Sequence, residues 1–139
     1  MDEASSLTSP RTGLFLISPR LARGALVVYI LCLLTLTHLP IASVPPMQTS
    51  DKLLHLLAYF AQGGFATLVL LTHFPISIFS VITLFMLSAL FAGLDEWTQS
   101  FVGRYPDWRD WYADLIGLSL GITATLLIHG LDMLWRRKA

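Results

Sequence analysis

The chain has 139 residues, of which 55% are hydrophobic and 13% are charged, and its mean hydropathy is +0.66. A soluble domain carries about a quarter charged residues, so this composition excludes an ordinary soluble domain, and the length allows only one domain. Basic and acidic residues balance to a formal net charge of zero, so no overall field indicates nucleic acid as a partner. The composition therefore predicts an integral membrane protein whose surroundings are the lipid bilayer.

Residues 1–23 are polar, contain Ser and Pro, and carry three arginines, so we expect a flexible cytoplasmic arm. The first apolar run, residues 24–41, has no charged residue and is just long enough to cross about 30 Å of hydrocarbon. A signal peptide is the alternative, but the lead is long and residues 41–43 make a poor cleavage site. We therefore predict the first membrane span here.

A proline-bearing loop at residues 42–50 follows the first span. Thr49 and Ser50 are good helix N-cap residues, and Asp51 suits the positive end of the helix that follows. The second predicted span covers residues 53–72 and begins directly after this cap.

The third predicted span, residues 76–94, follows a tight turn at residues 72–75. It ends where the acidic residues Asp95 and Glu96 begin. Residues 97–109 are polar and aromatic, and we expect them to form a loop.

The fourth predicted span, residues 108–131, begins after Asp107, which can cap the helix, with Asp110 at its third position. A basic tail, residues 136–139, follows the span. The predicted fold is therefore all-α: a bundle of four transmembrane helices over residues 24–135, with both termini on one side of the membrane.

The placement of Lys and Arg predicts the orientation, because cytoplasmic segments carry an excess of these residues. The side with the termini holds Arg11, Arg20, Arg23, Arg136, Arg137 and Lys138; the other side holds Lys52, Arg104 and Arg109. Tryptophans and tyrosines crowd the outer boundary, as an aromatic belt does. We therefore predict cytoplasmic N- and C-termini and a multi-pass protein of the plasma membrane.

Most acidic residues gather at the outer side of the predicted bundle, where they outnumber the basic residues by three. They are Asp51, Asp95, Glu96, Asp107, Asp110 and Asp114. His55 joins them one turn into the second span. This concentration is the strongest functional signal in the sequence.

Helical spacing predicts that these polar residues share faces with small residues. The faces hold Asp51, His55 and Gln62 on the second helix, Glu96 and Gln99 on the third, and Asp110, Asp114, Gly117 and Gly121 on the fourth. The spacing of Gly117 and Gly121 lets another helix pack closely against the fourth. We therefore expect the polar faces to meet inside the bundle, beneath the outer boundary.

Each of these residues also has a purely structural interpretation. Asp51, Asp107 and Asp110 can be helix caps, which we favour for Asp107, and Asp95 can simply end a span. No role is assigned to His38, His73 and His129, which lie near predicted span ends. His55, Glu96 and Asp114 are harder to dismiss, because a charge at the bilayer centre costs about 2.5–3.5 kcal/mol. A closed structural ion-pair network is the alternative for these three.

Two sets of motifs resemble the VanZ-like family of small integral membrane proteins. They are Asp51-Lys52-x-x-His55 followed by Tyr59, and Glu96-x-x-Gln99-x-Phe101-x-Gly103-Arg104 followed by Asp110 and Asp114-x-x-Gly117-x-x-x-Gly121. The resemblance covers the second span to the end of the fourth. One departure is Asp114, where the family usually has Asn; the extra carboxylate makes the site more acidic.

The resemblance implies a cell-envelope protein of a bacterial inner membrane. The family's namesake is linked to teicoplanin resistance at the outer surface, but the family has no established biochemical activity. The resemblance therefore implies fold and location, and we do not extend antibiotic resistance to this chain.

The polar residues permit three hypotheses of function. The first is a site for a lipid headgroup or another envelope ligand, formed by Asp51, Lys52, His55, Glu96, Gln99, Arg104, Asp110 and Asp114. In this hypothesis Arg104 grips an anion in a forked geometry, with Lys52 and His55 beside it. The acid excess would repel a bare phosphate unless a cation bridged it.

The second hypothesis is an enzyme acting on a lipid-linked envelope substrate, with His55 as general acid or base and a divalent cation on Glu96 and Asp114. No hydrolase or transferase motif supports it. A metal site is not assigned from sequence, since the single cysteine, Cys32, excludes a Cys-based motif. The third hypothesis is an accessory subunit of a membrane complex, and a transporter ranks last.

Overall fold

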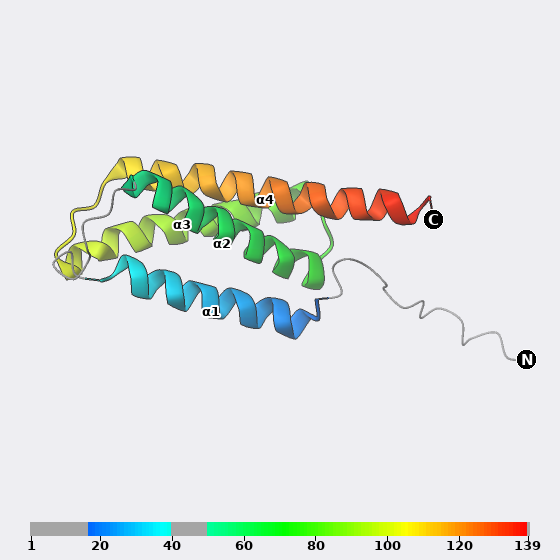
Figure 1. The fold of residues 1–139 in the computed structure, drawn as a ribbon, viewed down its shortest axis with the longest axis horizontal. Helices are drawn as coiled ribbons and strands as arrows, with labels where there is room; N and C mark the ends of the chain where they lie inside the picture. Colours follow the sequence, from blue (N-terminus) through cyan, green and yellow to red (C-terminus); the bar gives the residue numbers. More distant parts are fainter. Residues whose placement is uncertain (1–16, 40–49, 139) are drawn as a thin grey trace, which may run out of the picture.

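The computed structural model describes residues 17–39 and 50–138, which form four long helices arranged side by side (Figure 1). These are α1 (Pro19–Thr37), α2 (Asp51–His73), α3 (Ile78–Thr98) and α4 (Trp108–Arg136), with a short 3-10 helix, η2 (Gln99–Val102), continuing α3. All four are long and apolar enough to cross a membrane. The prediction of an all-helical chain with four candidate membrane spans is confirmed.

The first helix begins at Pro19 rather than at residue 24. Ser18 caps it, because its hydroxyl accepts a hydrogen bond from the backbone N–H of Leu21 at 3.2 Å, and a proline in the first turn fixes a helical backbone angle. Arg20 and Arg23 therefore belong to α1 and not to an arm. The rest of the predicted arm, and most of the predicted loop at residues 42–50, lie outside the described residues.

The third helix does not end at residue 94 but runs to Thr98, and η2 extends it to Val102. Asp95 and Glu96 do not mark the end of the span, because both side chains are buried inside the bundle, where they have hydrogen-bond donors. The predicted loop at residues 97–109 is correspondingly shorter.

The fourth helix continues past residue 131 to Arg136, the first residue of the predicted basic tail. Arg136 forms two hydrogen bonds with Asp132, at 2.9 and 3.0 Å, one helical turn away. Such a pair stabilises an exposed helical turn. At 29 residues, α4 is about 43 Å long and extends beyond the other helices (Figure 1).

The bundle is apolar outside and partly polar inside. Large aliphatic side chains on every helix are more than half exposed, including Leu31, Leu57, Leu87 and Leu127. The buried set combines a small hydrophobic cluster of Leu33, Tyr59, Ala92 and Leu118 with many polar side chains. A soluble protein rarely exposes so much contiguous apolar surface, and a hydrocarbon environment accounts for it. The structure therefore has the polarity of a multi-pass membrane protein.

The closest helix contact is between α2 and α4, where glycines bring the two backbones together. A Cβ atom added at Gly117 would collide with the carbonyl oxygen of Leu56, and one added at Gly121 would collide with that of Phe60. From the other side, a Cβ at Gly63 would lie 2.7 Å from the carbonyl oxygen of Leu118. The two glycines of α4 thus lie where their spacing predicted a helix contact, and this contact fixes how the ends of α2 and α4 face each other.

Candidate functional site

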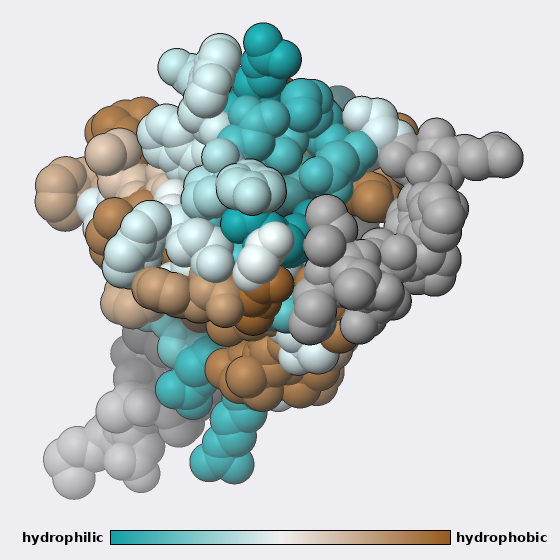
Figure 2. Space-filling view, turned by 90° about the vertical axis from the view of Figure 1, so that its left-hand side faces the viewer, coloured by the Kyte–Doolittle hydropathy of each residue, from teal (hydrophilic) through white to brown (hydrophobic). Residues whose placement is uncertain are grey.

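The polar residues collect at the end of the bundle where α2 and α4 begin and α3 ends. Figure 2 shows this end, with hydrophilic residues gathered across it. Five of the eight residues predicted from sequence are buried there, and we call them the polar site: His55, Glu96, Gln99, Asp110 and Asp114. The other three predicted residues lie around it: Asp51 and Lys52 are exposed, and Arg104 is half-buried.

The deepest contact of the polar site joins α2 to α4. The Nδ1 atom of His55 lies 2.9 Å from Oδ1 of Asp114, whose side chain is only 1% exposed. Gly117 lies one turn after Asp114 and packs on Leu56, the neighbour of His55, so the close backbone approach sets this distance. The second carboxylate oxygen of Asp114, Oδ2, is buried and has no hydrogen-bond partner among the described residues. The site therefore contains an acceptor that the described residues leave open.

Glu96 brings α3 into the polar site. Its Oε1 accepts a 2.7 Å hydrogen bond from the backbone N–H of Asp107, and its Oε2 accepts a 3.2 Å bond from the amide of Gln99. Both donors are neutral. One potential ligand atom each of His55, Glu96 and Asp114 lies within 4.8 Å of the other two. The predicted convergence of these three side chains from three helices is thus present in the structure.

Two basic residues lie at the rim of the polar site. The ammonium group of Lys52 is 3.0 Å from Oδ1 of Asp110 and 3.4 Å from Oδ2 of Asp107. The guanidinium of Arg104 has different partners. Its Nη2 is 3.8 Å from Oδ1 of Asp51, and its Nη1 is 3.5 Å from the carbonyl oxygen of Thr37. Arg104 is therefore a rim residue whose guanidinium contacts Asp51 and the carbonyl oxygen of Thr37.

Asp107 caps α4, as we favoured from sequence. Its Oδ1 accepts a 2.9 Å hydrogen bond from the backbone N–H of Arg109. This bond, followed by the hydrogen bond and charge of Lys52, lowers the pKa of the Asp107 carboxyl below its usual value. The same residue donates its own N–H to Glu96, so the start of α4 also holds part of the polar site.

Asp95 is a buried member of a neighbouring network, not merely the end of a span as the sequence analysis allowed. Its Oδ2 accepts a 2.9 Å hydrogen bond from the hydroxyl of Tyr59, and its Oδ1 accepts a 3.0 Å bond from Thr37. His38, which received no role, contacts the same network: Nδ1 is 3.6 Å from Oδ1 of Asp95, and Nε2 is 3.0 Å from the hydroxyl of Thr98.

Helical spacing indicates inward positions for Tyr59 and Asp95, which were not predicted as site residues. Tyr59 lies four residues after His55, and Asp95 lies three residues after the fully buried Ala92. Each is therefore on the inward face of its helix. No comparable signal identified Thr37 or His38, because their partners come from another helix.

The charges at this end of the bundle do not balance. Four carboxylates are buried: Asp95, Glu96, Asp110 and Asp114. Among the described residues, Lys52 is the only Lys or Arg that contacts one of them, and it contacts Asp110. His38 and His55 contribute positive charge only if protonated. A site of this kind can accept hydrogen bonds from hydroxyl or ammonium groups and can bind a cation.

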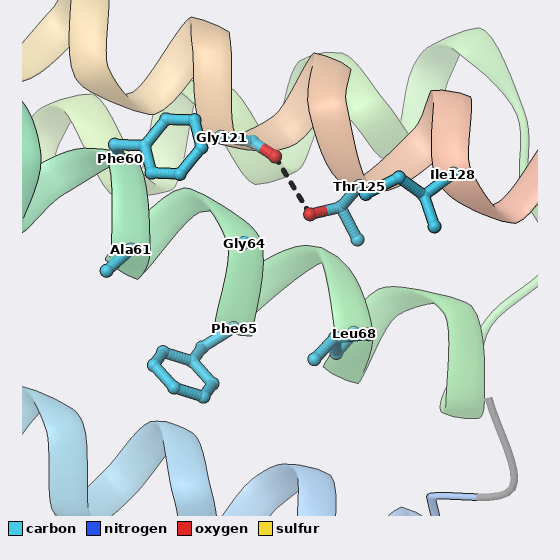
Figure 3. Close-up of a pocket in the computed structure, with 8 residues that line it drawn as sticks. All are labelled: Phe60, Ala61, Gly64, Phe65, Leu68, Gly121, Thr125 and Ile128. Atoms are coloured by element: carbon cyan, nitrogen blue, oxygen red, sulfur yellow. Dashed lines mark hydrogen bonds between the residues drawn. The ribbon is translucent and has the colours of Figure 1, made fainter. Parts of the chain in front are cut away.

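An apolar groove lies further along the same two helices (Figure 3). Its volume is 310 Å³, and it is lined by Phe60, Ala61, Gly64, Phe65, Leu68, Gly121, Thr125 and Ile128. The lone hydroxyl in the lining, that of Thr125, donates a 2.9 Å hydrogen bond to the carbonyl oxygen of Gly121. The groove therefore suits an apolar chain, and its lining residues carry no charged group.

The structure brings most of the predicted polar residues together, but relatives do not identify what they do. Comparison of the chain with protein-family models, curated proteins and solved structures finds no match in any of the three. The resemblance of the motifs to the VanZ-like family therefore stays a prediction. The chain is a helical bundle with four candidate membrane spans and a buried, acidic polar site at one end.

Proposed function

We propose that this protein binds the polar headgroup of a membrane lipid or a lipid-linked envelope precursor at the polar site. In this proposal both termini are cytoplasmic, and the polar site lies at the outer leaflet of a bacterial plasma membrane. The single observation that carries the proposal is the buried Oδ2 of Asp114, which the described residues leave without a hydrogen-bond partner in a cluster of buried carboxylates.

A network that served only to hold helices together would be expected to satisfy its own hydrogen bonds, because unpartnered buried polar groups are costly. Here the described residues leave Asp114 Oδ2 without a donor, and they give Glu96 only neutral donors. A ligand with hydroxyl or ammonium groups supplies what is missing. This argument favours binding over the hypothesis of a purely structural subunit.

The rim complements such a ligand. Arg104 is oriented by Asp51 and by the carbonyl of Thr37, and its planar guanidinium suits a phosphate oxygen pair. Lys52 is half exposed and adds a second positive charge. A headgroup with an anionic phosphate at the rim and a hydroxyl or amine in the acidic interior matches both charges. The membrane position lets the lipid tails remain among the exposed apolar side chains.

The test compares two arginines at the same end of the bundle. Arg109 is exposed and lies over the ring of Trp108, with 5.5 Å between its guanidinium carbon and the ring centroid, so Arg109→Ala is a matched control for Arg104→Ala. Native mass spectrometry of the detergent-purified protein should detect a bound phosphate-bearing lipid. We expect Arg104→Ala to lose it and Arg109→Ala to keep it. Equal retention in both variants, or no bound lipid in the wild type, contradicts the proposal.

The proposed orientation has its own test. Ser50 and Tyr105 are exposed at the end that carries the polar site. In a Cys32→Ala background, cysteines at these two positions should react with a membrane-impermeant reagent added to intact cells. Labelling that occurs only after permeabilisation shows that this end faces the cytoplasm and contradicts the proposed orientation.

The second candidate function is an enzyme acting on a lipid-linked substrate, and the His55–Asp114 pair favours it. A carboxylate 2.9 Å from a histidine orients the ring and stabilises its protonated form, which is how a general base is held. A His55→Gln variant that still binds the headgroup but no longer changes it chemically supports catalysis. Unchanged lipid in the wild type after prolonged incubation supports binding alone.

A further inference from the structure

We propose that His55, Glu96 and Asp114 bind a divalent transition-metal cation at the centre of the polar site. The three side chains come from α2, α3 and α4, and all are buried. One nitrogen or oxygen atom of each lies within 4.8 Å of the other two. Three potential ligands from three helices thus surround one point.

The spacing fits a metal ion after a small closure. Nitrogen and oxygen ligands of Zn²⁺ lie about 2.0–2.2 Å from the ion, so two of its ligands are at most about 4.4 Å apart. Side-chain rotations that move the ligand atoms by about 1 Å are enough to reach this spacing.

The two buried carboxylates, Glu96 and Asp114, favour a bound cation at this point. Glu96 receives hydrogen bonds from neutral groups, and Asp114 has a buried oxygen that the described residues leave without a hydrogen-bond partner. Burying anionic oxygens without a compensating charge is unfavourable, and buried charges in proteins are paired or coordinate metals. A divalent cation compensates both carboxylates at once.

A second group of potential ligands lies beside the first. We call His55, Glu96 and Asp114 the inner group and Asp51, His55 and Asp110 the outer group, and the inner group is the better metal site. Asp51, His55 and Asp110 also offer atoms within 4.8 Å of one another. Asp51 is exposed, however, and Asp110 is already 3.0 Å from the ammonium of Lys52. The outer group therefore has a lysine ammonium, whereas the described residues give the inner group no Lys or Arg and only the ring of His55, which is charged only if protonated.

The donor set selects the type of metal. Mg²⁺ and Ca²⁺ prefer sites made of oxygen ligands, whereas an imidazole nitrogen with carboxylate oxygens suits Zn²⁺ or Mn²⁺. The hydrogen bonds from Gln99 and from the Asp107 N–H hold the Glu96 carboxylate in place, as outer partners do in metal sites. Three protein ligands leave a coordination position open. That position can take a phosphate oxygen of the headgroup, and only this last step rests on the proposed function.

The test measures metal without any added lipid. Protein purified in detergent, with any affinity tag removed, is stripped with a chelator, loaded with Zn²⁺ or Mn²⁺ and dialysed. We expect about one tightly bound ion per chain by elemental mass spectrometry, and a melting temperature that rises with Zn²⁺ or Mn²⁺ and less with Mg²⁺ or Ca²⁺.

Variants locate the ion. Asp114→Asn and Glu96→Gln keep side-chain shape and remove ligand charge, so we expect the metal affinity to fall by at least about tenfold. Asp110→Asn tests the outer group and should keep the ion. A nitrogen coupling in the electron paramagnetic resonance spectrum of bound Mn²⁺ should disappear in His55→Gln. This spectrum and Glu96→Gln decide the matter if Asp114→Asn fails to fold.

Three results overturn the metal site: no retained ion in the wild type, no nitrogen coupling, or an equal loss of affinity in Asp110→Asn and Asp114→Asn. None of them depends on a lipid. A lipid that Arg104→Ala loses, in a protein without metal, leaves the proposed function intact and removes only this inference. A retained ion in a protein with no bound lipid supports the metal site and contradicts the proposed function.

Discussion

The same pair of helices builds two regions of opposite character. At the start of α2 and α4, His55 and Asp114 meet in a buried acidic cluster. Further along, Gly64 and Thr125 line an apolar groove whose hydroxyl is occupied by the helix itself. The close contact of Gly117 and Gly121 with α2 lies between the two regions, and Gly121 also lines the groove. One helix pair therefore forms a buried acidic cluster at one end and an apolar groove further along.

Breaking the contact between α2 and α4 at Gly117 should have the broadest effect, because it changes both regions. In Gly117→Ala the added Cβ meets the carbonyl oxygen of Leu56, which is backbone and cannot rotate away. We expect a loss of about 1–3 kcal/mol in the free energy of unfolding, as in other overpacked sites, together with separation of His55 from Asp114. Gly130→Ala is the control, because no atom of residues 17–39 or 50–138 lies within 4 Å of its added Cβ. Thermal unfolding in detergent measures both, and equal melting temperatures contradict the role of the contact.

Removing one donor should affect the polar end alone. Tyr59→Phe deletes the hydroxyl that donates to the buried Asp95. We expect a loss of about 1–3 kcal/mol, the cost of leaving a buried acceptor unsatisfied. Tyr112→Phe, at an exposed position of α4, should change stability by less than about 0.5 kcal/mol. The same unfolding measurement compares the two, and a neutral Tyr59→Phe shows that Asp95 has another donor.

The corresponding change in the groove should be smaller. Thr125→Val replaces a hydroxyl that bonds only to the carbonyl of Gly121, and that carbonyl keeps its helical environment. We expect a change of at most about 1 kcal/mol. A loss larger than that of Tyr59→Phe reverses the comparison between the two regions.

The smallest effect is expected at the cap of α4. The pKa of Asp107 is lowered in the folded protein, so this carboxylate stabilises the fold above its unfolded pKa of about 3.9. That contribution is lost as the pH falls through the lower, folded value. Amide hydrogen exchange at the start of α4 should accelerate in Asp107→Ala at neutral pH, and the difference from the wild type should shrink in strong acid. Exchange that is identical in the two proteins at neutral pH rules out the cap.

The positions of the helix ends show where sequence reasoning succeeds and fails. Residues 53–72 were predicted as a span, and α2 runs from Asp51 to His73, because hydrophobicity acts locally along the chain. The predicted cap Ser50 precedes the helix but makes no side-chain capping hydrogen bond. The third span was predicted to end at residue 94, where Asp95 and Glu96 begin, although helical spacing also placed Glu96 and Gln99 on a face of the same helix. Asp95 and Glu96 instead find donors inside the bundle, so the helix continues. A helix end set by partners on other helices cannot be predicted from its own residues.

Composition and helical periodicity alone determined that this chain forms four apolar helices, and that His55, Glu96 and Asp114 lie on inward faces. They could do so because hydrophobic burial and helical spacing depend on neighbours along the chain. Only the tertiary structure decided that Asp114 bonds His55, that the donors to Glu96 among the described residues are neutral, that Arg104 lies at the rim, and that Asp95 joins Tyr59. These pairings follow from the rotation and close approach of whole helices, which the glycine contact sets across the bundle.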